Sequence, residues 1–142
     1  MSAVNLLAVF VENKPGQTAA ITKLLAEAGV NICWVTIASS GSFGVMKFLV
    51  DKRDPAVRAL KDKGLMVSLL EALAVEMPDK PGSLQTVADL LGRNNINLEN
   101  CSGFVANHRA ILVIEVHELA QARAVLEKQG LHLLSQEEML GL

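Results

Sequence analysis

Two four-residue turns are the places where this chain has the residue types to bind a small molecule. Residues 13–16 read Asn-Lys-Pro-Gly, and residues 79–82, at an offset of 66, read Asp-Lys-Pro-Gly. An apolar run precedes each turn and a helical pattern follows it, so each turn joins a strand end to a helix N-terminus. The free N–H groups at such a terminus bind a carboxylate without a basic side chain. A plain tight turn with a capping asparagine fits the same spacing equally well.

Amide side chains near the turns complement a free amino acid. Asn13 stands at the end of the first strand, Asn31 follows the first helix, and Asn97 has the equivalent place in the second half. An amino acid carries one carboxylate and one ammonium group, so helix N–H groups and amide oxygens together satisfy both ends. We expect Asn31 to reach either the same pocket or a neighbouring repeat.

Other kinds of chemistry have weaker support in the sequence. Neither cysteine has a motif partner, and the acidic residues fall on predicted helix faces and caps, so no nucleophile with a base is recognisable. The histidines, His108, His117 and His132, show no zinc-binding spacing with each other or with a cysteine. An acylphosphatase on the predicted fold would need an arginine in the first turn, where this chain has Lys14. We expect no catalytic site, no metal and no cofactor.

Charge and hydrophobicity limit the partners of the protein. The net charge is −2, and the 13 Lys and Arg residues are scattered, so there is no basic stripe for nucleic acid. Hydrophobic residues make up 51% of the 142 residues, which predicts a buried interface beyond the core of each small domain. Cys33 and Cys101 are predicted to be free, buried thiols of a reducing cytosol. We expect a cytoplasmic protein, because the N-terminal apolar run is too short for a signal core or a membrane span.

The 66-residue offset extends well beyond the turns. It pairs residues 7–9, Leu-Ala-Val, with residues 73–75, and Asn31 with Asn97. Such a duplication predicts two small domains, at 1–70 and 71–142. No polar linker separates them, so we expect them to be rigidly placed.

Each half predicts the order strand, helix, strand, strand, helix, strand. The spacing of hydrophobic residues changes after each turn from the period of a strand to that of a helix, and glycines end the helices. The fold class is therefore predicted as α+β, with two ferredoxin-like βαββαβ repeats packed side by side, each an antiparallel sheet with its helices on one face. Predicted strands cover 6–11, 33–38, 45–50, 65–70, 73–77, 98–105, 110–116 and 131–134. Predicted helices begin at Thr18, at Asp54 as N-cap, at Ser83 and at Leu119, and residues 136–142 form a tail or a short added element.

Three stretches of the first half resemble the ACT domain, a module that senses amino acids in enzymes of amino-acid metabolism. They are residues 12–16, Glu-Asn-Lys-Pro-Gly; residues 26–29, Ala-Glu-Ala-Gly; and residues 30–32, Val-Asn-Ile. They closely resemble the serine-binding regulatory domain of phosphoglycerate dehydrogenase. The resemblance covers essentially the whole chain, so we expect a protein without a catalytic domain, similar to the small stand-alone tandem-ACT proteins.

The resemblance implies a ligand site at the seam between two repeats, walled by the turn of one and the second strand of the other. The second repeat departs from the pattern at Asp79, which replaces the amide and favours an ammonium group, and at Asn95, which stands where Gly29 was. One repeat is therefore expected to bind ligand while the other is structural or binds differently. Trp34 suits interface packing better than ligand contact. The implied ligand-binding residues are Asn13, Lys14, Pro15, Gly16, Gln17, Thr18, Asn31, Trp34, Asp79, Gly82, Ser83, Leu84, Asn97, Asn100 and Cys101.

The leading hypothesis is a non-catalytic regulatory protein that senses a free amino acid and modulates a partner enzyme of amino-acid metabolism. The apolar excess predicts a homodimer. Thr18, Ile37 and Cys101 hint at a ligand with a small or medium apolar side chain. The alternative is an interaction module that binds no ligand and docks a catalytic chain through its sheet face.

Overall fold

The computed structural model describes residues 3–142, which contain seven strands and five helices. The chain separates into two compact units. One is Asn5–Leu70, and the other is Glu71–Leu142 together with the N-terminal segment up to Val4. The first two residues of the repeat predicted at 1–70 lie outside the described residues.

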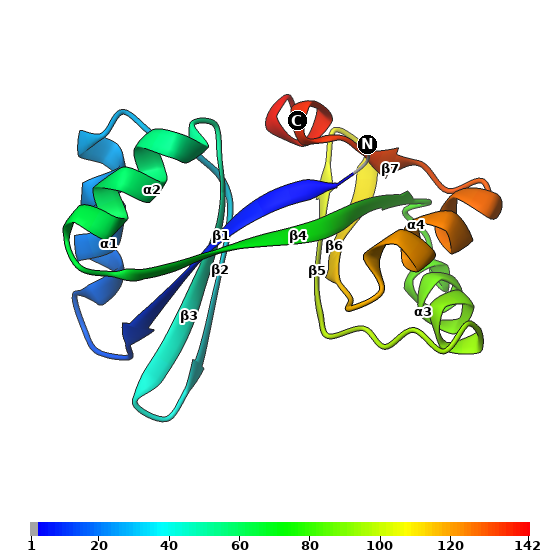
Figure 1. Ribbon diagram of the computed structural model, residues 1–142. Helices are drawn as coiled ribbons and strands as arrows, with labels where there is room; N and C mark the ends of the chain where they lie inside the picture. The colour runs from blue at the N-terminus through cyan, green and yellow to red at the C-terminus, as the bar shows by residue number, and fades with distance from the viewer. Residues whose placement is uncertain (1–2) are drawn as a thin grey trace. The chain divides into compact units, whose positions relative to one another are not determined.

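The unit Asn5–Leu70 is a four-stranded antiparallel sheet with two helices on one face (Figure 1). Its sheet order is β2-β3-β1-β4, with Leu7 of β1 opposite Phe48 of β3 and Val35 of β2 opposite the same Phe48. The elements in chain order are β1 (Val4–Glu12), α1 (Gln17–Glu27), β2 (Ile32–Ser40), β3 (Phe43–Val50), α2 (Arg53–Asp62) and the first half of β4 (Met66–Met77).

The core of this unit lies between the helices and the sheet. Ile21 and Leu25 of α1 pack with Leu60 of α2 on alternate residues of β1 and β3. The residues of β1 and β3 that alternate with these core residues point to the opposite face of the sheet, because successive side chains of a strand point to opposite faces. Leu6, Ala8 and Leu49 on that face are each only 1% exposed. From Leu6 to Val9 the apolar run of β1 is therefore buried on both faces, as the sequence predicted, but Phe10 at its end is 48% exposed.

The second unit repeats this architecture. Its sheet order is β7-β4-β6-β5, and all three pairings are antiparallel. Leu91 and Leu126 of the two long helices pack on Leu73, Leu112 and Ile114 of the sheet. The elements are the second half of β4, α3 (Ser83–Arg93), β5 (Asn100–Ala106), β6 (Arg109–Glu115), α4 (Leu119–Lys128), β7 (Leu133–Leu134) and α5 (Gln136–Leu140). The predicted class, α+β with two βαββαβ repeats, is confirmed.

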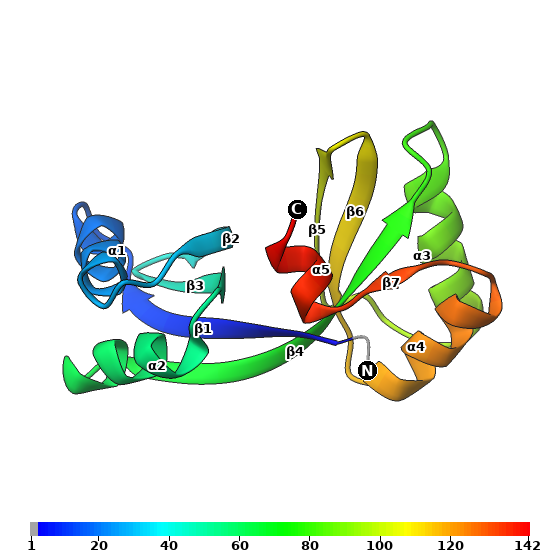
Figure 2. The ribbon, with the colours of Figure 1, turned by 90° about the horizontal axis from the view of Figure 1, so that it is seen from above.

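β4 is a single strand of 12 residues, where the sequence predicted two strands ending at 70 and starting at 73 (Figure 2). Glu71 does not interrupt the strand, because its side chain is exposed and a solvent-facing charge is compatible with strand geometry. The first half of β4 thus completes one sheet and its second half opens the other.

Other element ends also differ from the prediction. α2 begins at Arg53 with Lys52 as N-cap, so Asp54 is not the cap and lies in the first turn, where a negative charge complements the helix dipole. Residues 136–140 form a true helix, α5.

The prediction of buried thiols was wrong. Cys33 and Cys101 are free and exposed. They lie on β2 and β5, the outermost strands, where among the described residues no further strand covers them. Partial desolvation still raises the pKa of both thiols.

Candidate functional site

The first turn presents unpaired backbone donors. Gly16, the N-cap of α1, has φ 86° and ψ −11°, a left-handed conformation that favours glycine, and no side chain caps the helix. The N–H of Gln17 donates to Lys14 O and that of Ala20 to Gly16 O. No described residue accepts the N–H groups of Thr18 and Ala19 between them. These two donors point from the positive end of the helix dipole.

Asn13 ties this turn to the hairpin between β2 and β3. Its backbone N–H donates to Ser42 O at 2.8 Å, and its side-chain Nδ2 donates to Gly41 O at 3.1 Å. The amide nitrogen is thereby engaged, and Oδ1 keeps its capacity to accept. Lys14 lies 3.8 Å from the Glu12 carboxylate, and both side chains are exposed.

A small cavity of about 30 Å³ opens beside this turn. Its volume matches the share of one water molecule in the liquid. This unit alone therefore does not enclose an amino acid. Sequence reasoning missed Ser39, Gly44 and Met46, because the strand register brings them to the turn. The lining residues are Val11, Glu12, Asn13, Lys14, Gln17, Thr18, Ile37, Ser39, Gly44 and Met46.

Asn31 and Trp34 do not lie at the first turn within this unit. The backbone N–H of Asn31 donates to Asp51 Oδ1 at 2.9 Å, at the far end of the 11-residue helix α1. A helix of that length spans about 16 Å. Trp34 is half-buried and pairs with Leu49, on the face of the sheet away from α1.

The second turn copies the backbone of the first but not its side chains. Gly82 has φ 91° and ψ −8°, and again no side chain caps the helix, α3. Leu84 is 49% exposed, whereas Ser83 is 7% exposed and its Oγ has no hydrogen-bond partner among the described residues. Asp79 is exposed.

The remaining predicted residues of the second repeat lie away from this turn. Asn97 Nδ2 donates to Glu99 Oε2 at 2.7 Å. Asn100 and Cys101 are exposed on β5, opposite Glu115 and Ile114 of β6.

A larger cavity, of about 390 Å³, lies behind the second turn. Most of its walls were not predicted, because they come from the end of β4, one side of α3 and the segment before β7, which no local motif links. The lining residues are Met77, Pro78, Lys80, Pro81, Gly82, Ser83, Gln85, Thr86, Val87 and Leu131.

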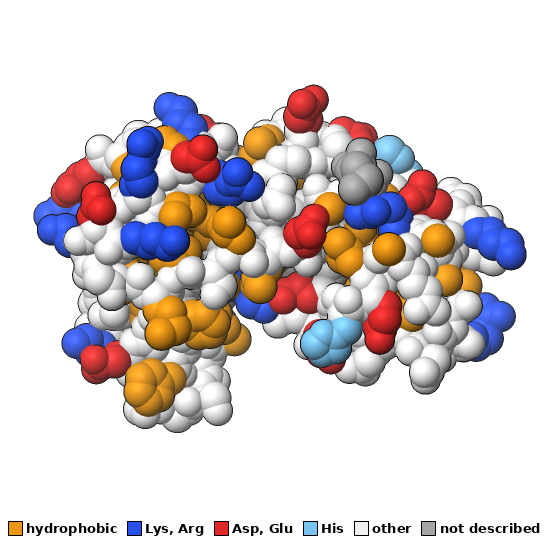
Figure 3. All heavy atoms as spheres, viewed as in Figure 1, with side chains coloured by type: hydrophobic (Ala, Val, Ile, Leu, Met, Phe, Trp, Pro, Cys, Tyr) orange, Lys and Arg blue, Asp and Glu red, His pale blue; other side chains and the backbone are white. Residues whose placement is uncertain are grey.

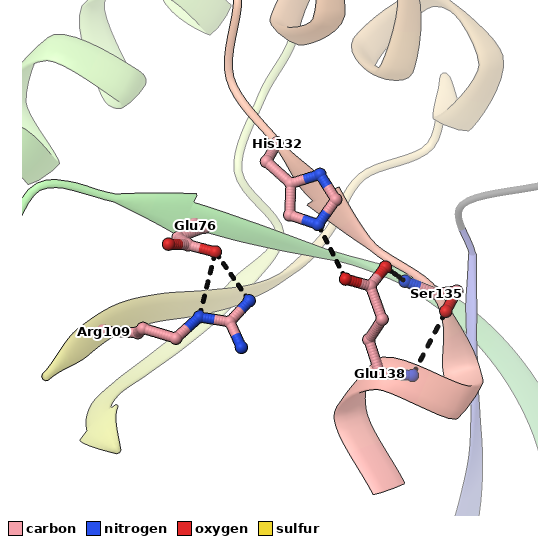
Figure 4. A network of polar contacts seen from close by, with 5 residues as sticks. All are labelled: Glu76, Arg109, His132, Ser135 and Glu138. Carbon is pink, nitrogen blue, oxygen red and sulfur yellow. Dashed lines mark hydrogen bonds and ion pairs between the residues drawn. The ribbon is translucent and has the colours of Figure 1, made fainter. Parts of the chain in front are cut away.

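A network of polar contacts joins β4, β6 and the C-terminal segment (Figure 4). Arg109 donates from Nε and Nη2 to Glu76 Oε1 at 3.1 and 2.7 Å, and these hydrogen bonds hold the pKa of Glu76 below its ordinary value. Glu138 accepts from the Ser135 N–H at 3.0 Å and lies 2.8 Å from His132 Nε2, contacts that also lower its pKa. The carboxylates are engaged in structural contacts.

Residues 3–142 lack two features that would point to other functions. No group of three or more His, Cys, Asp or Glu side chains is arranged to hold a metal ion. Nor is any helix in this part of the chain long and apolar enough to cross a membrane.

Comparison with known proteins agrees with this architecture. A family model for the ACT domain pair matches residues 2–142. Among curated proteins, none matches the sequence. A solved protein from Bacteroides thetaiotaomicron is 28% identical, with a TM-score of 0.92, and the alignment covers 99% of this chain and 98% of that one.

Two further solved structures share the fold at lower identity. The ligand-free regulatory subunit of aspartate kinase from Thermus thermophilus is 20% identical, with a TM-score of 0.61, over 89% of this chain and 91% of that one. Aspartate kinase from Clostridium acetobutylicum is 13% identical, with a TM-score of 0.57, over 87% of this chain and 32% of that one. With the family match spanning nearly every residue, the chain belongs to the family of ACT domain pairs.

Proposed function

We propose that this protein is a non-catalytic regulator that binds a free amino acid and modulates an enzyme of amino-acid metabolism. ACT domains are regulatory modules, and a regulatory subunit of aspartate kinase shares the fold. The observation that carries the proposal is the first turn, where Thr18 and Ala19 have unpaired N–H groups and where Asn13 and Thr18 line the same cavity.

The chemistry of the turn matches the two charged ends of an amino acid. The carboxylate accepts hydrogen bonds from Thr18 and Ala19 at the helix N-terminus. The ammonium group donates to Asn13 Oδ1, since Nδ2 of that amide already donates to Gly41 O. Ile37 and Met46, which line the same cavity, offer apolar contact to the ligand side chain.

We propose further that the protein pairs with a second copy, which completes this site. β2 and β5 are the outermost strands among the described residues, and an unpaired strand edge accepts another strand. Apolar side chains follow these edges: Val35 is 46%, Ile37 52% and Val105 57% exposed. A strand from a second copy would cover them and enlarge the small cavity. The effector then regulates only if it binds one arrangement of the subunits better than another.

A thermal-shift screen against the twenty free amino acids tests the proposal, with Trp34 fluorescence as a second readout. A ligand at about 100 times its dissociation constant stabilises a protein by about 2.7 kcal/mol. For a chain of this size that is a shift of several degrees in Tm. We expect one amino acid, or a few of similar shape, to give such a shift. No shift with any of the twenty, on folded protein free of carried-over ligand, would contradict the proposal.

Two variants locate the binding at the first turn. Asn13→Ala is expected to weaken binding of the effector by about 1–3 kcal/mol, because it removes the side-chain oxygen that accepts from the ammonium group. In Gly16→Val the side chain projects into open space where a carboxylate must approach, and the left-handed backbone costs at least about 1–2 kcal/mol of stability. Gly64→Val is the matched control, since Gly64 has φ 76° and equally open surroundings. Both glycine variants should lose stability, but only Gly16→Val should lose binding.

An observation on the sheet face favours a second candidate, a module that docks a catalytic chain. Phe10 is 48% and Phe43 67% exposed on the face opposite α1, and hydrophobic side chains gather over the ends of β1 and β3 (Figure 3). Exposed aromatic clusters are typical of protein interfaces. Docking should survive the Asn13 and Gly16 variants, whereas amino-acid binding should not.

A further inference from the structure

We propose that Phe10 and Phe43 bind a short amphipathic helix of a partner protein through its leucine or methionine side chains. Both rings lie on the open face of the first sheet, which is the face opposite α1 and α2. The inference rests on the docking function proposed above and names the kind of segment that docks. The second unit has the same fold and shows which features of this face the fold does not require.

The two aromatic residues depart from the duplicated pattern. At the offset of 66, Phe10 corresponds to Glu76. At the same offset, Phe43 corresponds to Arg109. The strand register is preserved, because the residue opposite Phe10 and the residue opposite Glu76 are also 66 positions apart. The second unit uses these positions for an ion pair with a distance of 2.7 Å, so the fold does not require exposed rings there.

Helix α5 covers the equivalent part of the second sheet. Leu134 of β7 and Met139 of α5 are buried, yet neither is among the described residues of the core under α3 and α4. Glu138 of α5 interacts electrostatically with both members of the ion pair between Glu76 and Arg109 (Figure 4). A short helix with a buried methionine therefore packs on the open face of the second sheet.

The first unit has no counterpart of α5 among the described residues. Residues 70–74, which are equivalent to α5, lie within β4. Phe10 and Phe43 are accordingly 48% and 67% exposed. A helix from a partner would take the place that α5 has in the second unit. Where Glu138 faces Arg109, this helix would face the ring of Phe43, so its contact surface there is uncharged.

The area and the rim of this patch fit a short segment better than a second copy of the chain. A buried Phe contributes about 150–250 Å², so two half-exposed rings present roughly 200 Å². A stable interface takes about 800 Å² from each partner. At the rim, Glu12 lies opposite Phe43 and 3.8 Å from Lys14, which leaves little net charge. An amphipathic helix of a few turns matches this apolar centre and polar rim.

Aromatic side chains on a sheet can also stack nucleic-acid bases. Such a surface needs cations that follow the phosphate backbone. On this face Lys47 is only 8% exposed, and Lys14 lies beside the Glu12 carboxylate. The charges therefore favour a protein segment.

NMR titration of the isotope-labelled 142-residue chain tests the inference. The probe is a synthetic amphipathic peptide of about four helical turns, with leucine on one face and Glu and Lys on the other. We expect saturable shifts of the backbone amides of residues 8–12 and 38–45. A peptide of the same composition in scrambled order lacks the apolar face and should bind at least about tenfold more weakly.

Variants locate the binding at the two rings. Phe10→Glu combined with Phe43→Arg gives the first sheet the residue pair of the second, so this variant should fold. It should bind the peptide at least about tenfold more weakly, because the exposed halves of two rings amount to one buried side chain. Phe43→Ser alone should weaken binding at least about threefold.

Leu69→Glu is the matched control for the loss of an exposed apolar side chain. Leu69 is 57% exposed and shares its face of β4 with Val67, which packs on the core under α1 and α2. This variant should bind the peptide as the wild-type protein does.

Three outcomes would overturn the inference: no saturable shifts, equal binding of the scrambled peptide, or full affinity in Phe43→Ser. Shifts of the same amides with a single-stranded uridine oligonucleotide, and none with the peptide, would identify a nucleic-acid surface instead. Docking of a catalytic chain that the double variant abolishes, without binding of the peptide, would keep the docking function and reject the helical segment. The amino-acid screen does not involve Phe10 or Phe43, so its result is independent.

Discussion

Single side chains distinguish two turns whose backbones are nearly identical. Gly16 and Gly82 share the left-handed conformation, yet Asn13 donates its amide to Gly41 O, and a carboxylate at position 79 cannot donate in that way. Ser83, buried and unpartnered, stands where the first turn has Gln17. A duplicated backbone thus carries different recognition chemistry at its two turns.

The ion pair between Glu76 and Arg109 predicts a dependence of stability on pH. Hydrogen bonds from Arg109 lower the pKa of Glu76 in the folded state. A carboxyl with a lowered folded pKa contributes stability above its unfolded pKa and loses that contribution as pH falls through its folded pKa. We expect Glu76→Gln to reduce the free energy of unfolding slightly at pH 7, because both side chains are about one-third exposed.

The difference in the free energy of unfolding between the wild-type protein and Glu76→Gln should shrink as the pH falls. The decrease should begin below 4.5, the ordinary pKa of a glutamate, and continue through the lowered pKa of Glu76 in the folded state. Urea unfolding at a series of pH values measures it, with Glu127→Gln on α4 as a control of equal charge change. A difference that is constant over the whole pH range would contradict this explanation.

At the scale of elements, α5 depends on its cap. A helix of five residues is too short to be stable alone. It begins with a capping box, in which Ser135 Oγ accepts from the Glu138 N–H at 3.1 Å and Glu138 accepts from the Ser135 N–H. His132 adds a further contact to Glu138, and Met139 is buried. Figure 2 shows α5 next to β7.

Removing the cap should therefore loosen the C-terminal segment. We expect Ser135→Ala to cost about 1 kcal/mol and to speed hydrogen exchange at residues 136–140. Ser40→Ala, at an exposed position of β2, should leave both quantities unchanged. Unchanged exchange in Ser135→Ala would show that packing of Met139, and not the cap, holds the helix.

At the scale of the whole molecule, the open strand edges predict self-association. Light scattering after size exclusion should give twice the chain mass of 15.2 kDa. Val35→Lys combined with Ile37→Lys should give the monomer, because a charge pointing from an edge strand opposes strand pairing. Met66→Lys, at a position 69% exposed, is the control and should remain dimeric. A monomeric wild-type protein, or a dimeric double variant, would contradict the prediction.

The sequence alone determined the features of the structure that depend on residues close together in the chain. The change of period from strand to helix placed nearly every element, and the turn glycines marked left-handed positions such as Gly16 and Gly29. The apolar run of β1 correctly indicated a strand buried on both faces from Leu6 to Val9, although Phe10 is exposed. Backbone preferences and hydrophobic periodicity act over a few residues, so they are visible without the fold.

Only the tertiary structure decided what depends on residues far apart in the chain. It joined two predicted strands into β4, exposed Cys33 and Cys101 at the outermost strands, and brought Asn13 to Gly41 across 28 residues. It also opened the cavity between Met77, Val87 and Leu131. Burial, hydrogen bonds and cavities arise when separate elements meet in space, and no local pattern records where those elements meet.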